Sequence, residues 1–73
     1  MKKDLVNYKE KFCNNLRELR KLKGYSQGDV AFMLKIPVST YANWEQGRRE
    51  PSIIDIYSIL KFYDIKPNDL FDF

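Results

Sequence analysis

Histidine is absent from this chain of 73 residues, and Cys13 is its only cysteine. Without histidine the chain lacks the commonest general base and metal ligand, and one cysteine cannot form a disulfide within the chain. The sequence also has no usable pair of nucleophile and base and no glycine-rich phosphate loop. We therefore expect no enzymatic activity, no metal site and no cofactor.

Long apolar runs are also missing. No window approaches 18 uninterrupted apolar residues, and the N-terminus lacks the apolar stretch and cleavage site of a signal peptide. We expect no membrane association and a cytoplasmic protein, which agrees with the lone cysteine. Residues 1–73 have the length of one small domain, which buries only about 60% of its unfolded surface. Its stability must come from helix packing or self-association.

Charge is unevenly distributed along the chain, whose formal net charge is +3. Residues 1–49 contain 11 Lys and Arg against 5 Asp and Glu, a balance of +6, whereas residues 50–73 contain 2 against 5, a balance of −3. A basic segment of this kind suits a polyanionic partner, but it also suits an ordinary solvated surface. Charge alone leaves both interpretations open.

The first helix is predicted from a stripe of apolar residues at positions 8, 12, 16 and 19, completed by Leu22. We expect this helix over about residues 9–23, because Gly24 follows a cationic last turn and can adopt the left-handed cap conformation. Residues 1–8 form either a frayed basic arm or an extension of this helix.

Two short helices should follow. Ser26 and Asp29 form the pattern of a capping box, and this helix should end near Leu34 because Pro37 disfavours a helical residue before it. The next helix should run over about residues 38–46 with Pro37 at its start, and Gly47 should end it. Tyr41 and Trp44, three residues apart, should face the core.

Two more helices complete the predicted fold. Ser52 and Asp55 form a second capping box before a helix over about residues 53–63. The apolar positions that mark this helix as amphipathic are Ile53, Ile56, Tyr57, Leu60 and Tyr63. A short fifth helix should begin at Pro67 and bury Leu70 and Phe71. No useful strand-like alternation is present, so we predict an all-α domain of five helices.

The corner between the second and third predicted helices has the pattern of a helix-turn-helix. Ala31 supplies the small residue that the close approach of two helices requires. The apolar residues at the offsets that face the core are Val30, Leu34, Ile36, Tyr41 and Trp44. The same pattern also suits any helical hairpin in a small bundle, so it does not by itself establish DNA recognition.

Three segments resemble the lambda-repressor/Cro-like helix-turn-helix proteins, also called the XRE family. They are L-R-E-L-R at residues 16–20, Y-S-Q-G-D-V-A at residues 25–31 and W-E-Q-G-R-R-E-P at residues 44–51. The resemblance covers about residues 12–71. It implies a compact five-helix domain that binds double-stranded DNA in a sequence-specific way. It further implies a transcriptional regulator, expected to be a repressor, that binds a pseudo-palindromic operator as a dimer.

The family pattern assigns roles to individual residues. Arg20 and Glu45 match an ion pair between the first and third helices, and Gln27 matches a phosphate contact at the start of the second. The base-reading positions correspond to Val38, Ser39, Thr40 and Asn43. The sugar-phosphate contacts after them correspond to Gln46, Arg48 and Arg49. Without the resemblance, Gln27 and Arg49 are ordinary exposed residues, and Ser39 and Thr40 are helix-start caps.

Two residues depart from the family pattern. Lys35 stands where glycine often adopts the left-handed turn, at a cost on the order of 1 kcal/mol. Pro37 stands where Ser or Thr usually caps the recognition helix, so a cap hydrogen bond is lost. These departures affect the expected position of Val38 and Ser39 more than that of Asn43.

Two features leave room for other functions. Cys13 is either a partly buried, unreactive thiol or, with Lys9 and Arg17 one turn away, a redox-sensitive one. Phe62, Phe71 and Phe73 exceed what one small core is expected to bury, which predicts an apolar patch for a partner or a dimer. An alternative function is therefore an antitoxin or adaptor that binds a protein through the last two helices.

Overall fold

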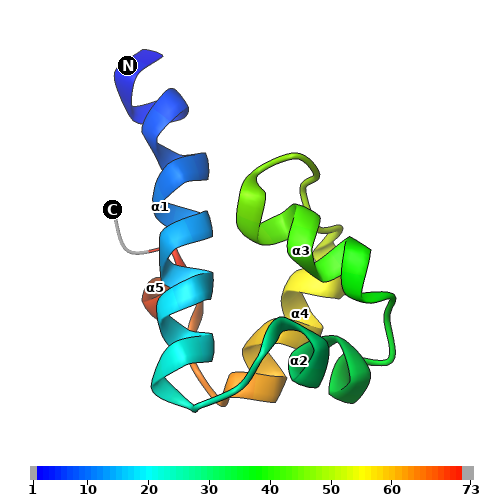
Figure 1. Cartoon of the computed structure of the whole chain (residues 1–73). Helices are drawn as coiled ribbons and strands as arrows, with labels where there is room; N and C mark the ends of the chain where they lie inside the picture. The colour runs from blue at the N-terminus through cyan, green and yellow to red at the C-terminus, as the bar shows by residue number, and fades with distance from the viewer. Residues whose placement is uncertain (1, 72–73) are drawn as a thin grey trace.

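Five helices form the chain in the computed structural model, which describes the backbone of residues 2–71 and the side chains of residues 8–71 (Figure 1). The helices are α1 (Lys2–Leu22), α2 (Gln27–Leu34), α3 (Val38–Gln46), α4 (Ile53–Tyr63) and α5 (Pro67–Leu70). Residues 2–71 contain no strand. The predicted all-α, five-helix fold is confirmed.

The first helix is longer than its apolar stripe predicts. It begins at Lys2, so the segment for which an arm or an extension was expected is helical from residue 2 onward. At its other end Gly24 adopts a left-handed conformation with φ of 76°. There the N–H of Tyr25 donates to the carbonyl of Arg20 at 3.1 Å, which closes the last turn.

Both predicted capping boxes are present. The Asp29 N–H donates to Ser26 Oγ at 3.0 Å, and the Ser26 N–H donates to Asp29 Oδ2 at 2.9 Å. Ser52 and Asp55 make the same two hydrogen bonds, each 3.1 Å long. These bonds satisfy backbone donors that the first turn of a helix leaves free, so they set where α2 and α4 begin.

The corner between α2 and α3 keeps the expected left-handed geometry without a glycine. Lys35 has φ of 62° and ψ of 43°, and the Ile36 N–H donates to the carbonyl of Ala31 at 3.0 Å. Pro37 is the N-cap of α3 with φ of −62°, and it provides no side-chain cap bond. The predicted loss of the cap is confirmed, and α3 still begins at Val38 because proline's fixed φ suits a helix start.

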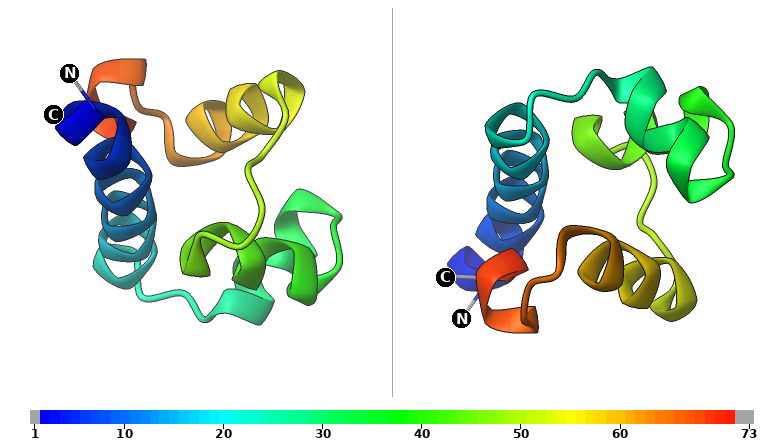
Figure 2. Two further views of the ribbon diagram at one scale, coloured as in Figure 1. Left: turned by 90° about the horizontal axis from the view of Figure 1, so that it is seen from above. Right: turned by 90° about the horizontal axis from the view of Figure 1, so that it is seen from below.

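The core lies where α1 and α5 face the other three helices (Figure 2). Its members are the buried apolar side chains among the described residues: Phe12, Cys13, Leu16, Val30, Ala31, Tyr41, Trp44, Ile59, Tyr63 and Leu70. Asn15 Nδ2 donates to the carbonyl of Leu70 at 2.9 Å, which attaches α5 to the middle of α1. Two of these core residues, Tyr41 and Trp44, belong to α3. A helix as short as α3 is not stable alone, so long-range packing holds it in place.

Three residues of the predicted apolar stripes face solvent instead. Leu22 is 81% exposed, Ile53 is 86% exposed and Tyr57 is 61% exposed. The buried stripe of α4 centres on Ile59 and Tyr63, which are four residues apart. Because successive helical residues are about 100° apart, a face centred there turns Tyr57 toward solvent. Leu22 and Ile53 are the last residue of α1 and the first of α4, at the edge of the core.

The sequence predicted an exposed apolar patch formed by Phe62, Phe71 and Phe73, and for the first two of these residues the prediction is wrong. Phe62 is half-buried, with its ring centroid 4.9 Å from that of Tyr63 and 5.8 Å from that of Tyr25. Phe71 stacks on Phe12 with a centroid distance of 5.5 Å. Phe73 lies outside the described residues. Among the described side chains, the large apolar ones most exposed to solvent are Leu22, Phe32, Ile53, Ile54 and Tyr57.

Candidate nucleic-acid interface

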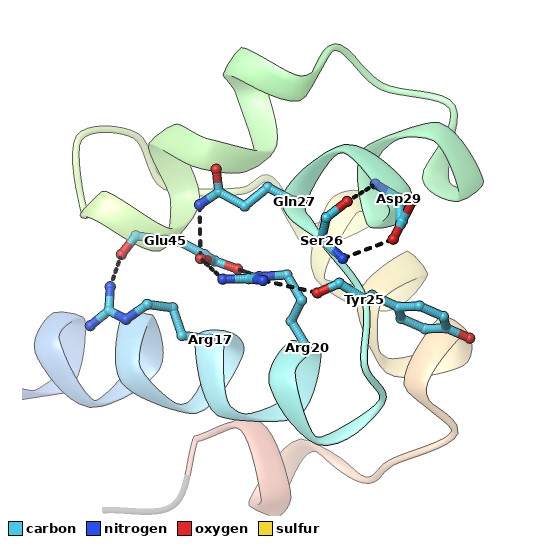
Figure 3. Close-up of polar contacts among 7 residues, drawn as sticks. All are labelled: Arg17, Arg20, Tyr25, Ser26, Gln27, Asp29 and Glu45. Atoms are coloured by element: carbon cyan, nitrogen blue, oxygen red, sulfur yellow. Dashed lines mark hydrogen bonds and ion pairs between the residues drawn. The ribbon is translucent and has the colours of Figure 1, made fainter.

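Arg20 and Glu45 connect α1 to α3 across the interior (Figure 3). Arg20 Nε lies 2.7 Å from Glu45 Oε2, and Arg20 Nη2 lies 3.3 Å from Glu45 Oε1. The same guanidinium donates from Nη1 to the carbonyl of Tyr25 at 2.9 Å. Because Glu45 is only 1% exposed, this two-bond contact fixes how α3 lies against α1.

Gln27 adds α2 to the same cluster. Its Nε2 donates to Glu45 Oε1 at 3.0 Å, so a single buried carboxylate contacts both α1 and α2 (Figure 3). A carboxamide nitrogen carries two hydrogens, and this contact uses one of them. The predicted phosphate-binding residue therefore has a structural contact toward the interior and one N–H left for an acceptor outside.

Arg17 also belongs to this cluster, although the sequence pointed to it only as a cation near Cys13. Its Nη1 donates to the backbone carbonyl of Glu45 at 2.6 Å, and its Nη2 contacts Asn14 Oδ1. Arg17 lies three residues before Arg20 and therefore on the same face of α1. That spacing is visible in the sequence, but the backbone carbonyl that it meets depends on how α3 is placed.

The electrostatics of the cluster favour the charged form of Glu45. Burial alone would raise its pKa, but the hydrogen bonds from Arg20 and Gln27 outweigh burial and hold the pKa below its ordinary value of 4.5. The hydrogen bond to Glu45 in turn raises the pKa of Arg20. Both groups thus remain ionised at neutral pH, and their attraction holds α3 in place.

The outer side of α3 carries the predicted base-reading residues. Val38 and Ser39 are exposed in its first turn, while Thr40 and Asn43 are half-exposed. Asn43 follows Ser39 by four residues, so both side chains lie on one face of the helix. Within residues 8–71 the side chains of Ser39, Thr40 and Asn43 make no hydrogen bond, and none of them caps α3. Their polar groups are free to contact a ligand.

The chain leaves α3 through a left-handed Gly47, with φ of 75°. The N–H of Arg48 donates to the carbonyl of Asn43 at 3.0 Å, which places this segment against the last turn of α3. Gln46, Arg48 and Arg49 are all exposed. Gln46 thus lies in the last turn of α3 and the two arginines directly after it, while Gln27 reaches α3 from the start of α2.

The sequence left open whether the Cys13 thiol is redox-sensitive or unreactive, and the structure favours the unreactive thiol. Its Sγ donates to the carbonyl of Trp44 at 3.3 Å, and it is buried. Burial raises the pKa of the thiol, against the opposing effect of Arg17 and Lys9. A buried thiol whose pKa is raised is a poor nucleophile, so its contribution is packing between α1 and α3.

Together, a left-handed corner between two short helices, a second helix held by a buried ion pair, and a free outer face define a helix-turn-helix. Residues 16–70 match a family model described as "Helix-turn-helix". The chain belongs to this family, and the resemblance to its lambda-repressor/Cro-like, XRE branch is confirmed.

Two known proteins are similar to the chain over most of its length. The HTH-type transcriptional regulator DdrOP3 of Deinococcus deserti is 36% identical over 62 residues, which cover 85% of this chain and 48% of that protein. The chain thus spans about half the length of this curated relative. The restriction-modification controller protein C.AhdI from Aeromonas hydrophila is 39% identical, with a TM-score of 0.77. That match covers 84% of this chain and 92% of the C.AhdI chain.

Within the described part of the chain, none of the helices combines the length and the apolar character needed to cross a membrane.

Proposed function

We propose that the chain is a sequence-specific regulator of transcription that binds double-stranded DNA and inserts α3 into the major groove. The observation that carries this proposal is the contrast between the two sides of α3. Its inner side is fixed to α1 and α2 through Glu45, whereas its outer side presents unpaired polar groups. The two relatives, a transcriptional regulator and a restriction-modification controller protein, support the same function.

Base recognition is assigned to four residues of α3. The carboxamide of Asn43 matches the paired donor and acceptor of adenine, and the hydroxyls of Ser39 and Thr40 suit bases or phosphates. Val38 is 52% exposed at the start of α3 and suits the methyl group of thymine. Asn43 is the central residue of this set, because it is farthest from the proline start of the helix.

Affinity is assigned to contacts with phosphates on both sides of α3. Gln27 and the first N–H groups of α2 form one set, and Gln46, Arg48 and Arg49 form the other. Such contacts position the protein and respond to salt without reading sequence. Arg48 is the stronger candidate of the two arginines, because its N–H makes the shorter hydrogen bond to the carbonyl of Asn43, at 3.0 Å against 3.4 Å for Arg49.

Dimerisation is assigned to the exposed apolar residues of α4. Ile53 and Ile54 are 86% and 77% exposed, and Tyr57 lies one turn farther along the helix. A second copy that covers these residues would remove apolar surface from water. A symmetric dimer with recognition helices about 34 Å apart would bind a pseudo-palindromic operator and act as a repressor by occupying it.

We propose no second function, because Phe62 and Phe71, which suggested a protein partner, pack on the core.

The test is a fluorescence anisotropy titration against genomic fragments selected for binding and against random DNA of equal length. We expect tight binding to selected fragments, weak binding to random DNA, and affinity for both that falls steeply as salt rises from 50 to about 200 mM. Arg48→Ala should weaken both and lower the salt slope by about one, whereas Lys66→Ala, at an exposed lysine between α4 and α5, should leave both unchanged. A wild-type chain that binds no DNA at low salt would contradict the proposal.

A further inference from the structure

A cavity of about 80 Å³, partly open to solvent, lies between α1, the connection from α3 to α4, α4 and the C-terminal end of α5. One water molecule needs roughly 10–15 Å³ by such a measure, so the cavity has room for about six non-hydrogen atoms. The walls are mostly apolar side chains and one thiol: Phe12, Cys13, Trp44, Pro51, Ile56 and Phe71. In Figure 1, the connection after α3 lies beside the N-terminal half of α1.

Apart from Arg49, which is exposed at the rim, the polar side chains at the edge of this cavity are paired. Cys13 Sγ donates to the carbonyl of Trp44, and Tyr8 Oη donates to Glu50 Oε2 at 2.9 Å. Lys9 Nζ lies 3.9 Å from the same carboxylate oxygen. A water inside needs two to four polar partners, and groups already paired at the rim offer it few. The cavity therefore favours an apolar occupant over water.

We propose that this cavity is a binding site for a small uncharged apolar molecule, such as a single aromatic ring or a short branched aliphatic chain. A charged molecule would lose its hydration without gaining a partner in the apolar interior. A molecule much larger than a six-membered ring would extend out of the cavity into solvent. The chemical class follows from the volume and from the side chains of the wall.

The position of the cavity connects it to DNA binding. Trp44 belongs to α3, Gly47 ends that helix, and Arg49 at the cavity rim is one of the residues assigned to phosphate contact. A Cβ on Gly47 would lie 3.4 Å from Cys13 Sγ, so the end of α3 packs closely on α1 at this point. An occupant there would alter how the connection after α3 is held and thereby change DNA affinity. This second step rests on the proposed function.

The first experiment measures binding without DNA. Trp44 is the only tryptophan in the chain, and its indole N–H gives one NMR resonance that reports directly on the cavity wall. Benzene should shift this resonance saturably. At ten times its dissociation constant it should raise the midpoint of thermal unfolding by about 9 °C. Pyrimidine has the same shape but two polar nitrogens, so its effect should be several-fold smaller.

Matched variants separate the cavity from the rest of the surface. Ile56→Phe should fill the cavity and abolish the benzene response, whereas Ile54→Phe, on the exposed side of the same helix, should retain it. Cys13→Leu, which fills the cavity from the opposite wall, is the second filling variant if Ile56→Phe does not fold. An unsaturable Trp44 response, an equal response to pyrimidine, or a response that survives in a folded filling variant would overturn the site.

The second experiment measures operator affinity with and without saturating benzene. We expect a change of at least about threefold for the wild type and none for a folded filling variant. An unchanged wild-type affinity would overturn the effect on DNA binding. If the wild type bound no DNA at all, the proposed function would fail, while the Trp44 measurement would still decide whether the cavity binds its ligand.

Discussion

Glu45 is the polar residue that joins α3 to both α1 and α2. Its carboxylate accepts hydrogen bonds from Arg20 on α1 and Gln27 on α2, and its backbone carbonyl accepts one from Arg17. A buried ion pair of this kind does little for net stability compared with apolar residues of similar size, but removing one partner leaves an uncompensated charge. Glu45 therefore acts mainly on the position of α3.

Glu45→Gln tests this role through the dependence of stability on pH. The folded-state pKa of Glu45 is lowered, so its stabilising contribution is complete above about pH 5.5 and is lost as pH falls below 4.5 through the folded value. We expect Glu45→Gln to lower the free energy of unfolding by about 3 kcal/mol at pH 7. The difference from wild type should shrink toward pH 3.

Urea denaturation at both pH values measures this difference, and Glu18→Gln is the control because Glu18 is an exposed carboxylate on α1. Equal losses of stability for Glu45→Gln at pH 7 and pH 3 would show that the loss comes from packing and not from the charge of Glu45.

The sequence anticipated part of this cluster. The motif that contains Trp44 and Glu45 placed the Arg20 partner correctly, because both residues lie at positions that the family pattern defines. It did not predict that Gln27 turns toward Glu45 or that Arg17 reaches a backbone carbonyl. Both contacts join residues of different helices, and their geometry depends on packing that no local pattern specifies.

At the scale of elements, the limits of α2, α3 and α4 follow from local chemistry. Capping boxes at Ser26 and Ser52 set two of the starts, and Gly47 sets the end of α3. The buried face of α4 was less predictable, because its sequence offers apolar residues on more than one side. Which of them is buried depends on the orientation of α4 against α1 and α2, so Ile53 and Tyr57 were placed wrongly.

Lys35→Gly tests the cost of the corner between α2 and α3. Lys35 is left-handed, a conformation that costs a residue with a Cβ about 1–2 kcal/mol, and glycine regains part of this while losing chain entropy. We expect a net gain of about 0.5 kcal/mol in the free energy of unfolding by urea titration. Lys61→Gly, inside α4, should instead lose about 1 kcal/mol. A destabilised Lys35→Gly would contradict the assignment of strain to this residue.

At the scale of the whole molecule, the basic and acidic parts of the sequence correspond to different helices. The first 49 residues, with a balance of +6, contain α1, α2, α3 and the two arginines that follow, whereas the acidic remainder contains α4 and α5. This arrangement suits a chain that meets a polyanion through its first part and a second copy through α4. The apolar surface that remains exposed on α4 agrees with this division.

Ile54→Lys tests the proposed dimer surface. Because Ile54 is 77% exposed, the substitution should change stability by no more than about 0.5 kcal/mol. A charge at this position should nevertheless weaken self-association at least tenfold, as measured by sedimentation equilibrium. Leu22→Lys, an equally exposed apolar position on α1, should leave self-association unchanged. If Ile54→Lys associated as the wild type does, α4 would not be the interface.

The most direct test of the central claim, that α3 reads bases, is operator binding by Asn43→Ala. We expect its affinity for the selected operator to fall by about 1–3 kcal/mol, or roughly 5–150-fold, with little change in affinity for random DNA. Asn68→Ala, an exposed asparagine on α5, should match the wild type on both DNAs. An Asn43→Ala chain that kept both the affinity and the sequence preference of the wild type would contradict the proposed role of α3 in recognition.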